Sequence, residues 1–172
     1  MKRIAARASS GLAPVFASLT PATCAVDAST GVVRTVGAGT CTISIAQPGD
    51  GTTWAAATTL TRSLTITKAS VKITTRAYVG TTLLPNPAKV AYKKTVTIRG
   101  SMTKLLAGKY VYVWQRIGTG SWTRLTSRRV DAYGRVSYGY IVTRADVSFR
   151  FSWSGNPNTT AATGTTIRIY RK

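Results

Sequence analysis

Arginine is the residue type with which this sequence could bind a ligand. Five arginines lie between residues 116 and 135, interleaved with tyrosines and tryptophans, namely Arg116, Arg124, Arg128, Arg129 and Arg135. A guanidinium group donates two parallel hydrogen bonds to a carboxylate or a phosphate, and aromatic rings stack on nucleobases. If strand alternation places these arginines on one exposed face, that face could bind an anionic cell-wall polymer, a glycan or an acidic protein surface.

Nucleic acid is a weaker candidate for the partner of these arginines. The basic residues occur singly or in pairs, such as Lys93-Lys94 and Arg128-Arg129, and form no continuous basic arm. A simpler alternative is that the arginines form a solvated coat that contributes to solubility alone. We expect most of the interleaved aromatic residues, such as Tyr110, Tyr112 and Trp114, to pack in the core or in cross-strand pairs.

The sequence lacks the residue types on which most catalytic sites depend. It contains no His and no Glu, which excludes His-dependent catalytic triads and the common metal sites. The four aspartates occur singly, so no glycosidase pair is indicated. Ser101-Met102-Thr103-Lys104 fits the Ser-x-x-Lys pattern of penicillin-recognising enzymes, but it lies in a β context without the accompanying motifs, and we attribute it to chance. We expect a protein that is not an enzyme and has no cofactor.

The positive charge is unevenly distributed along the chain. The 172 residues include 24 Lys and Arg and 4 Asp, a formal net charge of +20. Residues 1–68 hold six basic and two acidic residues, which gives +4, and residues 69–172 hold eighteen and two, which gives +16. This asymmetry predicts two units, of which the second faces something anionic.

The only cysteines, Cys24 and Cys41, are separated by seventeen positions and fall in strand-like segments. Three uses are open to them: a structural disulfide, a redox pair or a metal site. A metal site is the poorest fit, because there is no His and no further Cys to complete the ligands. The even number of cysteines suits a disulfide in an exported protein.

Alternating hydrophobicity predicts an all-β protein. Thr, Val, Ile and Tyr alternate with polar residues in short runs bounded by Gly, Pro, Asn and Asp, and no segment has a sustained helical period. The clearest predicted strands are 40–45, 64–67, 95–98, 110–114, 121–125, 135–141, 147–153 and 166–170, and we also expect a strand at 4–8. Many short strands at this spacing are typical of sandwiches and barrels.

An internal echo predicts two domains. The segment from Gly49 to Thr58 and the segment from Gly155 to Thr163 share a Gly-Asx start and a Thr- and Ala-rich continuation, and each precedes a strand. The two glycines are 106 positions apart, a domain length rather than a solenoid period. We therefore predict domains at 1–68 and 69–172, joined near Lys68-Ala69-Ser70.

The N-terminus imitates the start of a signal peptide without continuing as one. Met1-Lys2-Arg3 is basic, but Arg7, Gly11 and Pro14 interrupt the apolar run that should follow. No stretch of eighteen apolar residues exists, so we predict no transmembrane helix. Export would then depend on something outside this sequence.

Both predicted domains resemble bacterial immunoglobulin-like (Ig-like) domains. Residues 5–67 resemble a repeat of large secreted and surface proteins, on the segments 8–12, 21–26, 37–43, 49–57 and 62–66, with Trp54 where that family usually has Tyr. Residues 70–172 resemble a related Ig-like domain common in actinobacterial surface and exported proteins, on the segments 96–100, 106–108, 116–122, 131–136 and 149–155. The resemblance implies two Ig-like β-sandwiches in tandem and a disulfide between Cys24 and Cys41.

One departure from the family concerns its opening strand, which normally precedes the segment that begins at Ala5. Three explanations are open: the chain is a fragment or has a misplaced start, residues 1–4 supply a short substitute, or a neighbouring chain donates a strand by β-augmentation. The resemblance implies a spacer and an adhesion or attachment module, extracellular or at a cell surface. The alternative is a structural component of a phage virion or surface appendage.

Overall fold

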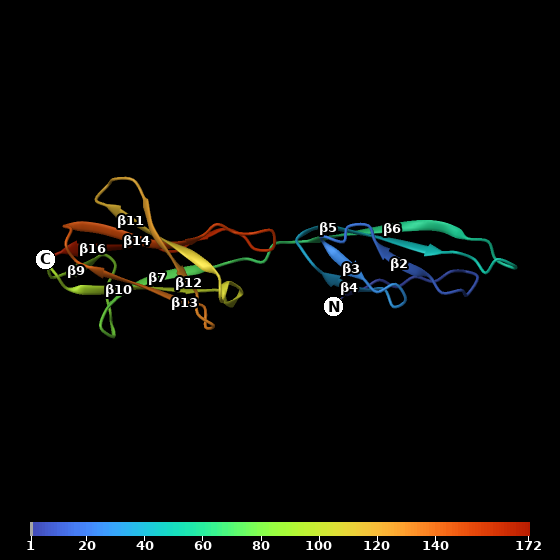
Figure 1. The fold of residues 1–172 in the computed structure, drawn as a ribbon, viewed down its shortest axis with the longest axis horizontal. Coiled ribbons are helices and arrows are strands. Elements are labelled where there is room, and N and C mark those ends of the chain that lie inside the picture. Colours follow the sequence, from blue (N-terminus) through green and yellow to red (C-terminus); the bar gives the residue numbers. More distant parts are fainter. Residues whose placement is uncertain (1) are drawn as a thin grey trace. The chain divides into compact units, whose positions relative to one another are not determined.

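The computed structural model describes residues 2–172, whose regular secondary structure is almost entirely β-strand (Figure 1). The only helical element among them is a single 3-10 turn, η1 (Lys104–Leu106). The chain divides into two compact units, the first ending at Lys68 and the second extending from Ala69 to Lys172. The all-β prediction is confirmed. Within the described residues, no helix has the length and apolar character needed to cross a bilayer.

The first unit contains two three-stranded antiparallel sheets. In one, the order is β1 (Lys2–Arg3), β4 (Val32–Thr35) and β3 (Cys24–Val26). In the other, the order is β2 (Val15–Ser18), β5 (Gly39–Gln47) and β6 (Ala57–Ile66). The predicted strand at 4–8 is wrong: β1 ends at Arg3, and beyond it only the Ile4 backbone N–H continues the pairing, donating to the Gly31 carbonyl.

A small core and a disulfide connect the two sheets of the first unit. Six buried residues form the core, namely Phe16, Cys24, Val33, Cys41, Ile43 and Ile45. Cys24 on β3 and Cys41 on β5 form a disulfide with their Cα atoms 5.6 Å apart, and both are fully buried. The disulfide implied by the resemblance is therefore confirmed, and it joins one sheet to the other.

Asp27 holds the turn between β3 and β4. Its Oδ1 accepts hydrogen bonds from the backbone N–H groups of Ser29 and Thr30, at 3.2 and 2.8 Å, and from both hydroxyls, at 2.9 and 2.8 Å. These bonds, the Thr30 backbone bond first, lower the pKa of Asp27 from 3.8 to about 2.

The first prediction is that protonation of Asp27 weakens the first unit in acid. Because the folded pKa lies below the unfolded one, the stabilisation is present above pH 4 and is lost as the pH falls from about 4 towards 2. We expect the melting temperature (Tm) of Asp27→Asn to change less over this range than that of the unmodified chain. Thermal unfolding measured at pH steps checks this; identical pH profiles would contradict it.

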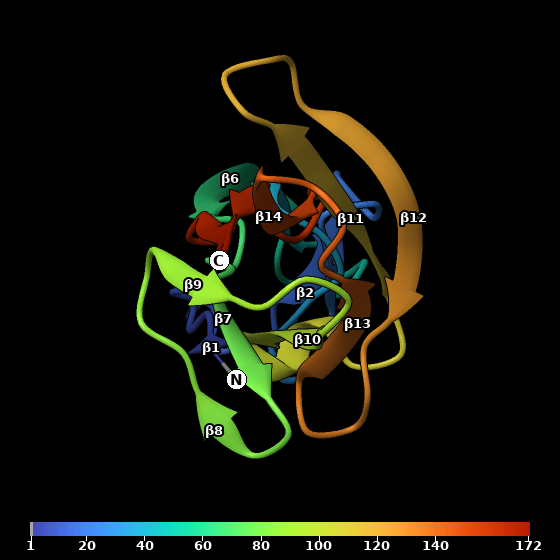
Figure 2. The same ribbon diagram turned by 90° about the vertical axis from the view of Figure 1, so that its left-hand side faces the viewer.

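The second unit contains two larger sheets. One has the order β13 (Arg135–Ile141), β10 (Thr95–Met102), β7 (Ile73–Val79) and β8 (Thr82–Leu83). The other has the order β12 (Thr123–Arg129), β11 (Tyr110–Ile117), β14 (Asp146–Trp153), β16 (Ile167–Arg171) and β9 (Ala88–Val90), with β15 (Ala162–Thr163) beside β14. Figure 2 shows β12 running along β11 and curving towards β13.

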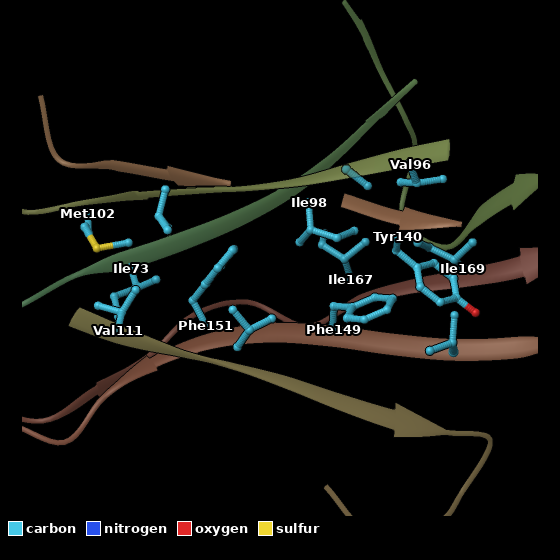
Figure 3. Packing of buried hydrophobic residues seen from close by; sticks show 14 of the residues in the cluster. Ile73, Val96, Ile98, Met102, Val111, Tyr140, Phe149, Phe151, Ile167 and Ile169 are labelled. Carbon is cyan, nitrogen blue, oxygen red and sulfur yellow. The ribbon is translucent and has the colours of Figure 1, made fainter. Parts of the chain in front are cut away.

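Side chains from both sheets meet in one core in the second unit (Figure 3). One sheet contributes the buried side chains of Ile98 on β10 and Ile73 on β7. The other contributes those of Phe149 and Phe151 on β14. Buried positions alternate with more exposed ones along β10, from Thr95 to Met102. This arrangement is consistent with a β-sandwich.

Gly100 is the one position of β10 where the core leaves no space for a side chain. A Cβ there would lie 2.7 Å from Val136 Cγ1 and 2.9 Å from Phe151 Cδ2. The second prediction is that Gly100→Ala destabilises the second unit by about 1–3 kcal/mol through overpacking. Gly139→Ala on the neighbouring strand meets nothing within 4 Å and is the matched control. Chemical denaturation measures both; equal stabilities of the two variants would contradict the prediction.

The two similar sequence segments, which begin at Gly49 and Gly155, form two similar loops. Gly49 and Gly155 have φ values of 79° and 81°. Asp50 Oδ1 then accepts backbone N–H groups of residues 52, 53 and 54, and Asn156 Oδ1 accepts those of residues 158 and 159. A carboxylate and an amide thus organise equivalent turns, one in each unit.

Candidate anion-binding groove

A groove of about 800 Å³ lies on the second unit, over the outer face of β13, β10 and β7. Strand alternation decides which side chains line it. Ala77, Ile98 and Val136 point into the core, so their neighbours on each strand point out. The outward set is Thr74, Arg76 and Tyr78 on β7, Arg99 and Ser101 on β10, and Arg135 and Ser137 on β13.

The register of the sheet places two arginines directly opposite each other in this groove. Arg99 on β10 pairs with Arg76 on β7, and Ser101 pairs with Arg135 on β13. Like charges at facing positions of adjacent strands destabilise a sheet. The sequence therefore maintains an arrangement that costs stability and concentrates positive charge.

Two more arginines reach the groove from the end of β12. Arg129 Nε donates to the Gly108 carbonyl at 3.3 Å, and Arg128 Nη1 lies 3.4 Å from both Thr126 Oγ1 and the Ser127 carbonyl. These long bonds to neutral acceptors leave the positive charge of both groups uncompensated. The groove thus collects guanidinium groups from four strands.

Asp131 is the acidic residue of the groove lining, and its carboxylate holds a backbone turn rather than an arginine side chain. Its Oδ1 accepts the backbone N–H groups of Tyr133 and Arg135, at 2.9 and 2.7 Å. Among residues 2–172, the one side-chain salt bridge joins Arg168 and Asp146, away from the groove. Five arginines therefore face the groove without an ion-pair partner within the described residues: Arg76, Arg99, Arg128, Arg129 and Arg135.

Aromatic rings support three of these guanidinium groups. The Arg99 guanidinium carbon lies 4.5 Å from the Tyr78 ring centroid, and that of Arg135 lies 5.6 Å from the Tyr133 centroid. Arg128 lies 5.8 Å from the Tyr138 ring. Such stacking restricts the guanidinium plane and leaves its N–H edges available to an anion. Groups ordered in this way lose less conformational entropy on binding.

The five arginines singled out in the sequence do not share one face. Arg128, Arg129 and Arg135 line the groove. Arg124 and Arg116 lie on the outer face of the other sheet, over Tyr112 and Trp122 at 4.9 and 5.1 Å. Arg76 and Arg99 were missed, because only the β7–β10–β13 register brings them beside Arg135.

Most of the interleaved aromatics are expected either in the core or in cross-strand pairs, and the core position is wrong for β11. Val111 and Val113 take the inner positions of β11, so Tyr110, Tyr112 and Trp114 point outward. Further along the chain the expectation is correct for Tyr140, whose ring lies 4.8 Å from that of Phe149 in the core.

Comparison with known proteins gives no relative from which a function could be inferred. No protein-family model matches it, and comparison with curated proteins and with solved structures gives no match. The function must therefore be argued from the groove itself.

Proposed function

We propose that this chain is a non-catalytic attachment module, and that its second unit binds an anionic polymer in the groove over β13, β10 and β7. The observation that carries the proposal is the set of five arginines facing one groove with no ion-pair partner. A linear polyanion with phosphate, sulfate or carboxylate groups would offer each guanidinium a charged acceptor. The Arg76–Arg99 repulsion would then be offset only in the bound state.

A cell-wall polymer or an acidic glycan fits the groove better than a nucleic acid does. Binding of single-stranded nucleic acid uses open aromatic faces on which bases stack. Tyr78 is the aromatic residue that lines the groove, and the Arg99 guanidinium already lies over its ring. What the groove offers instead is N–H donors, and hydroxyls from Thr74, Ser101 and Ser137 suit the sugar or ester oxygens beside each charge.

The first unit would act as a spacer, and both units would be Ig-like β-sandwiches of an extracellular or surface-displayed protein. Supporting this are the all-β fold, the resemblance to bacterial Ig-like domains and the buried Cys24–Cys41 disulfide. Disulfides persist in oxidising compartments and are rare in the cytosol.

One feature of the first unit favours a second role, as a structural component that assembles through strand addition, in a virion or an appendage. β6 pairs with β5 alone, and its ten residues leave a long unpaired edge. Leu60 lies on the core side, opposite Ile45, yet remains 53% exposed. Long apolar edges recruit further strands. Light scattering at high concentration tests this role, and a monodisperse monomer would contradict it.

Binding to immobilised polymers tests the main proposal. Heparin, teichoic acid and double-stranded DNA are the probes, each measured at several salt concentrations. We expect heparin or teichoic acid to bind, with an affinity that falls steeply as salt rises, because polyanions release counterions when arginines bind them. Absence of binding to all three polymers at low salt would refute the proposal.

A further inference from the structure

In the second unit, the sheet that contains β11 and β14 carries a separate group of polar side chains on its outer face. On β11, Trp114 and Arg116 point outward, because Val113 is buried. On β14, Ser148 and Arg150 share this face, because Phe149 and Phe151 occupy the core positions. The register sets Trp114 opposite Arg150, and Arg116 opposite Ser148. None of these residues lines the groove.

Two guanidinium groups converge on one indole ring here. The Arg150 guanidinium carbon lies 4.0 Å from the Trp122 ring centroid, and that of Arg116 lies 5.1 Å from it. Trp122 lies just before β12, after the turn that joins β11 to β12. The β11–β12 hairpin thus brings the tryptophan against two arginines that neighbouring strands supply.

Three polar atoms in this cluster are buried without a hydrogen-bond partner among the described residues. They are Arg116 Nε, Arg150 Nε and Ser148 Oγ. Ser148 is fully buried. It lies between Arg116 on β11 and Arg168 on β16, its register partners on the two neighbouring strands. Buried polar groups are nearly always paired, so three unpaired donors on one face call for a ligand that satisfies them.

The charges of the cluster are only partly compensated. Burial lowers the pKa of the Arg150 guanidinium, and the positive charge of Arg116 lowers it further. The nearby carboxylate, Asp146, is held by Arg168, whose Nε and Nη2 donate to it at 2.9 and 2.5 Å. The hydrogen bonds from Arg168, and then the charge of Arg116, lower the pKa of Asp146. Asp146 thus attracts Arg116 without forming a salt bridge with it, and the repulsion between Arg116 and Arg150 remains.

We propose that Arg116, Arg150 and Ser148 form a site for one compact oxyanion, a phosphate or sulfate group, beside Trp122. An anion between the two guanidinium groups accepts N–H bonds from both and removes their repulsion. Small rotations of the two side chains bring the Nε–H groups to the anion, and the Ser148 hydroxyl supplies a third donor. The site recognises one tetrahedral group, whereas the groove accommodates a chain of charges.

The anion has two sources with the same chemistry: free inorganic phosphate or sulfate, and a phosphate ester on a sugar. Isothermal titration with sodium phosphate and with glucose 6-phosphate, at constant ionic strength set by sodium chloride, measures both. We expect saturable one-to-one binding of at least one probe. The tighter of the two identifies the source, and absence of saturable binding by both would overturn the proposal.

Three variants locate the site. Arg116→Gln with Arg150→Gln should weaken phosphate binding at least tenfold, and Arg34→Gln with Arg62→Gln, two exposed residues of the first unit, should leave it unchanged. Arg116→Lys with Arg150→Lys keeps the charge but loses the planar fork of hydrogen-bond donors, so this variant should also bind phosphate more weakly. Lysine variants that bind as tightly as the unmodified chain, or first-unit variants that lose binding equally, would overturn the proposal and show diffuse charge attraction.

Ser148→Ala provides a variant whose folding is not in question. It removes a buried hydroxyl that has no partner, so the unliganded chain should be as stable as before or more stable. Phosphate binding should nevertheless weaken severalfold. Unchanged phosphate affinity would remove Ser148 from the site and contradict the donor set proposed here. Because this site and the groove use different residues, either can fail while the other stands.

Discussion

Replacing Arg76 and Arg99 by glutamine is expected to weaken binding of heparin or teichoic acid about a hundredfold without destabilising the fold. The two residues face each other across β7 and β10, and neither forms a salt bridge within residues 2–172. Hydrogen bonds to charged groups contribute about 1.5–3 kcal/mol each, so losing two is a large effect. Relief of the like-charge pair should leave Tm equal or higher.

The control for this variant removes two charges elsewhere. Arg34 and Arg62 are exposed and lie in the first unit, so Arg34→Gln with Arg62→Gln lowers the net charge by the same amount. We expect its affinity for the polymer to fall only slightly at moderate salt, since distant charges are screened. If the two double variants lose affinity equally, the groove is not the binding site and net charge alone explains the attraction.

The second large effect concerns the Cys24–Cys41 disulfide. Replacing both cysteines by alanine should destabilise the first unit by about 3 kcal/mol, because the bond closes a loop of seventeen positions that the unfolded chain would otherwise explore. The core of this unit contains only six buried residues, two of them these cysteines. A small core has little other stabilisation to offset such a loss.

Calorimetry distinguishes the two units in this variant. The chain forms two compact units, so we expect two unfolding transitions. The transition of the first unit should move to lower temperature, and that of the second should stay where it is. A variant whose first transition is unchanged would show that the disulfide contributes no stability. Equal movement of both transitions would show that the units unfold together.

The strands were largely predictable from sequence, because alternation of β-branched and polar residues reports a half-buried sheet directly. The strand predicted at 135–141 matches β13 at both ends, and 95–98 falls within β10. The prediction of a strand at 4–8 was wrong because alternation over only five residues also occurs in an extended segment that is not part of a sheet. The disulfide followed from the resemblance to Ig-like repeats and not from spacing.

The site was only partly predictable, for two physical reasons. Alternation shows that successive residues face opposite sides, but in Tyr110–Trp114 both sets are apolar, so it does not say which set is buried. Valines took the core positions, and the outward-facing Tyr112 lies under the Arg124 guanidinium. The second reason is register: Arg76, Arg99 and Arg135 are distant in sequence, and only strand pairing brings them together.

The measurement that tests the groove most directly is a map of the residues whose environment changes when the polymer binds. Backbone amide chemical shifts of the isotope-labelled chain are followed by NMR during titration with a short heparin oligosaccharide. We predict that the largest shifts fall in residues 74–78, 99–101 and 128–137, the three segments around the groove. Shifts spread evenly over basic residues of both units, or gathered in the first unit, would contradict the proposed function.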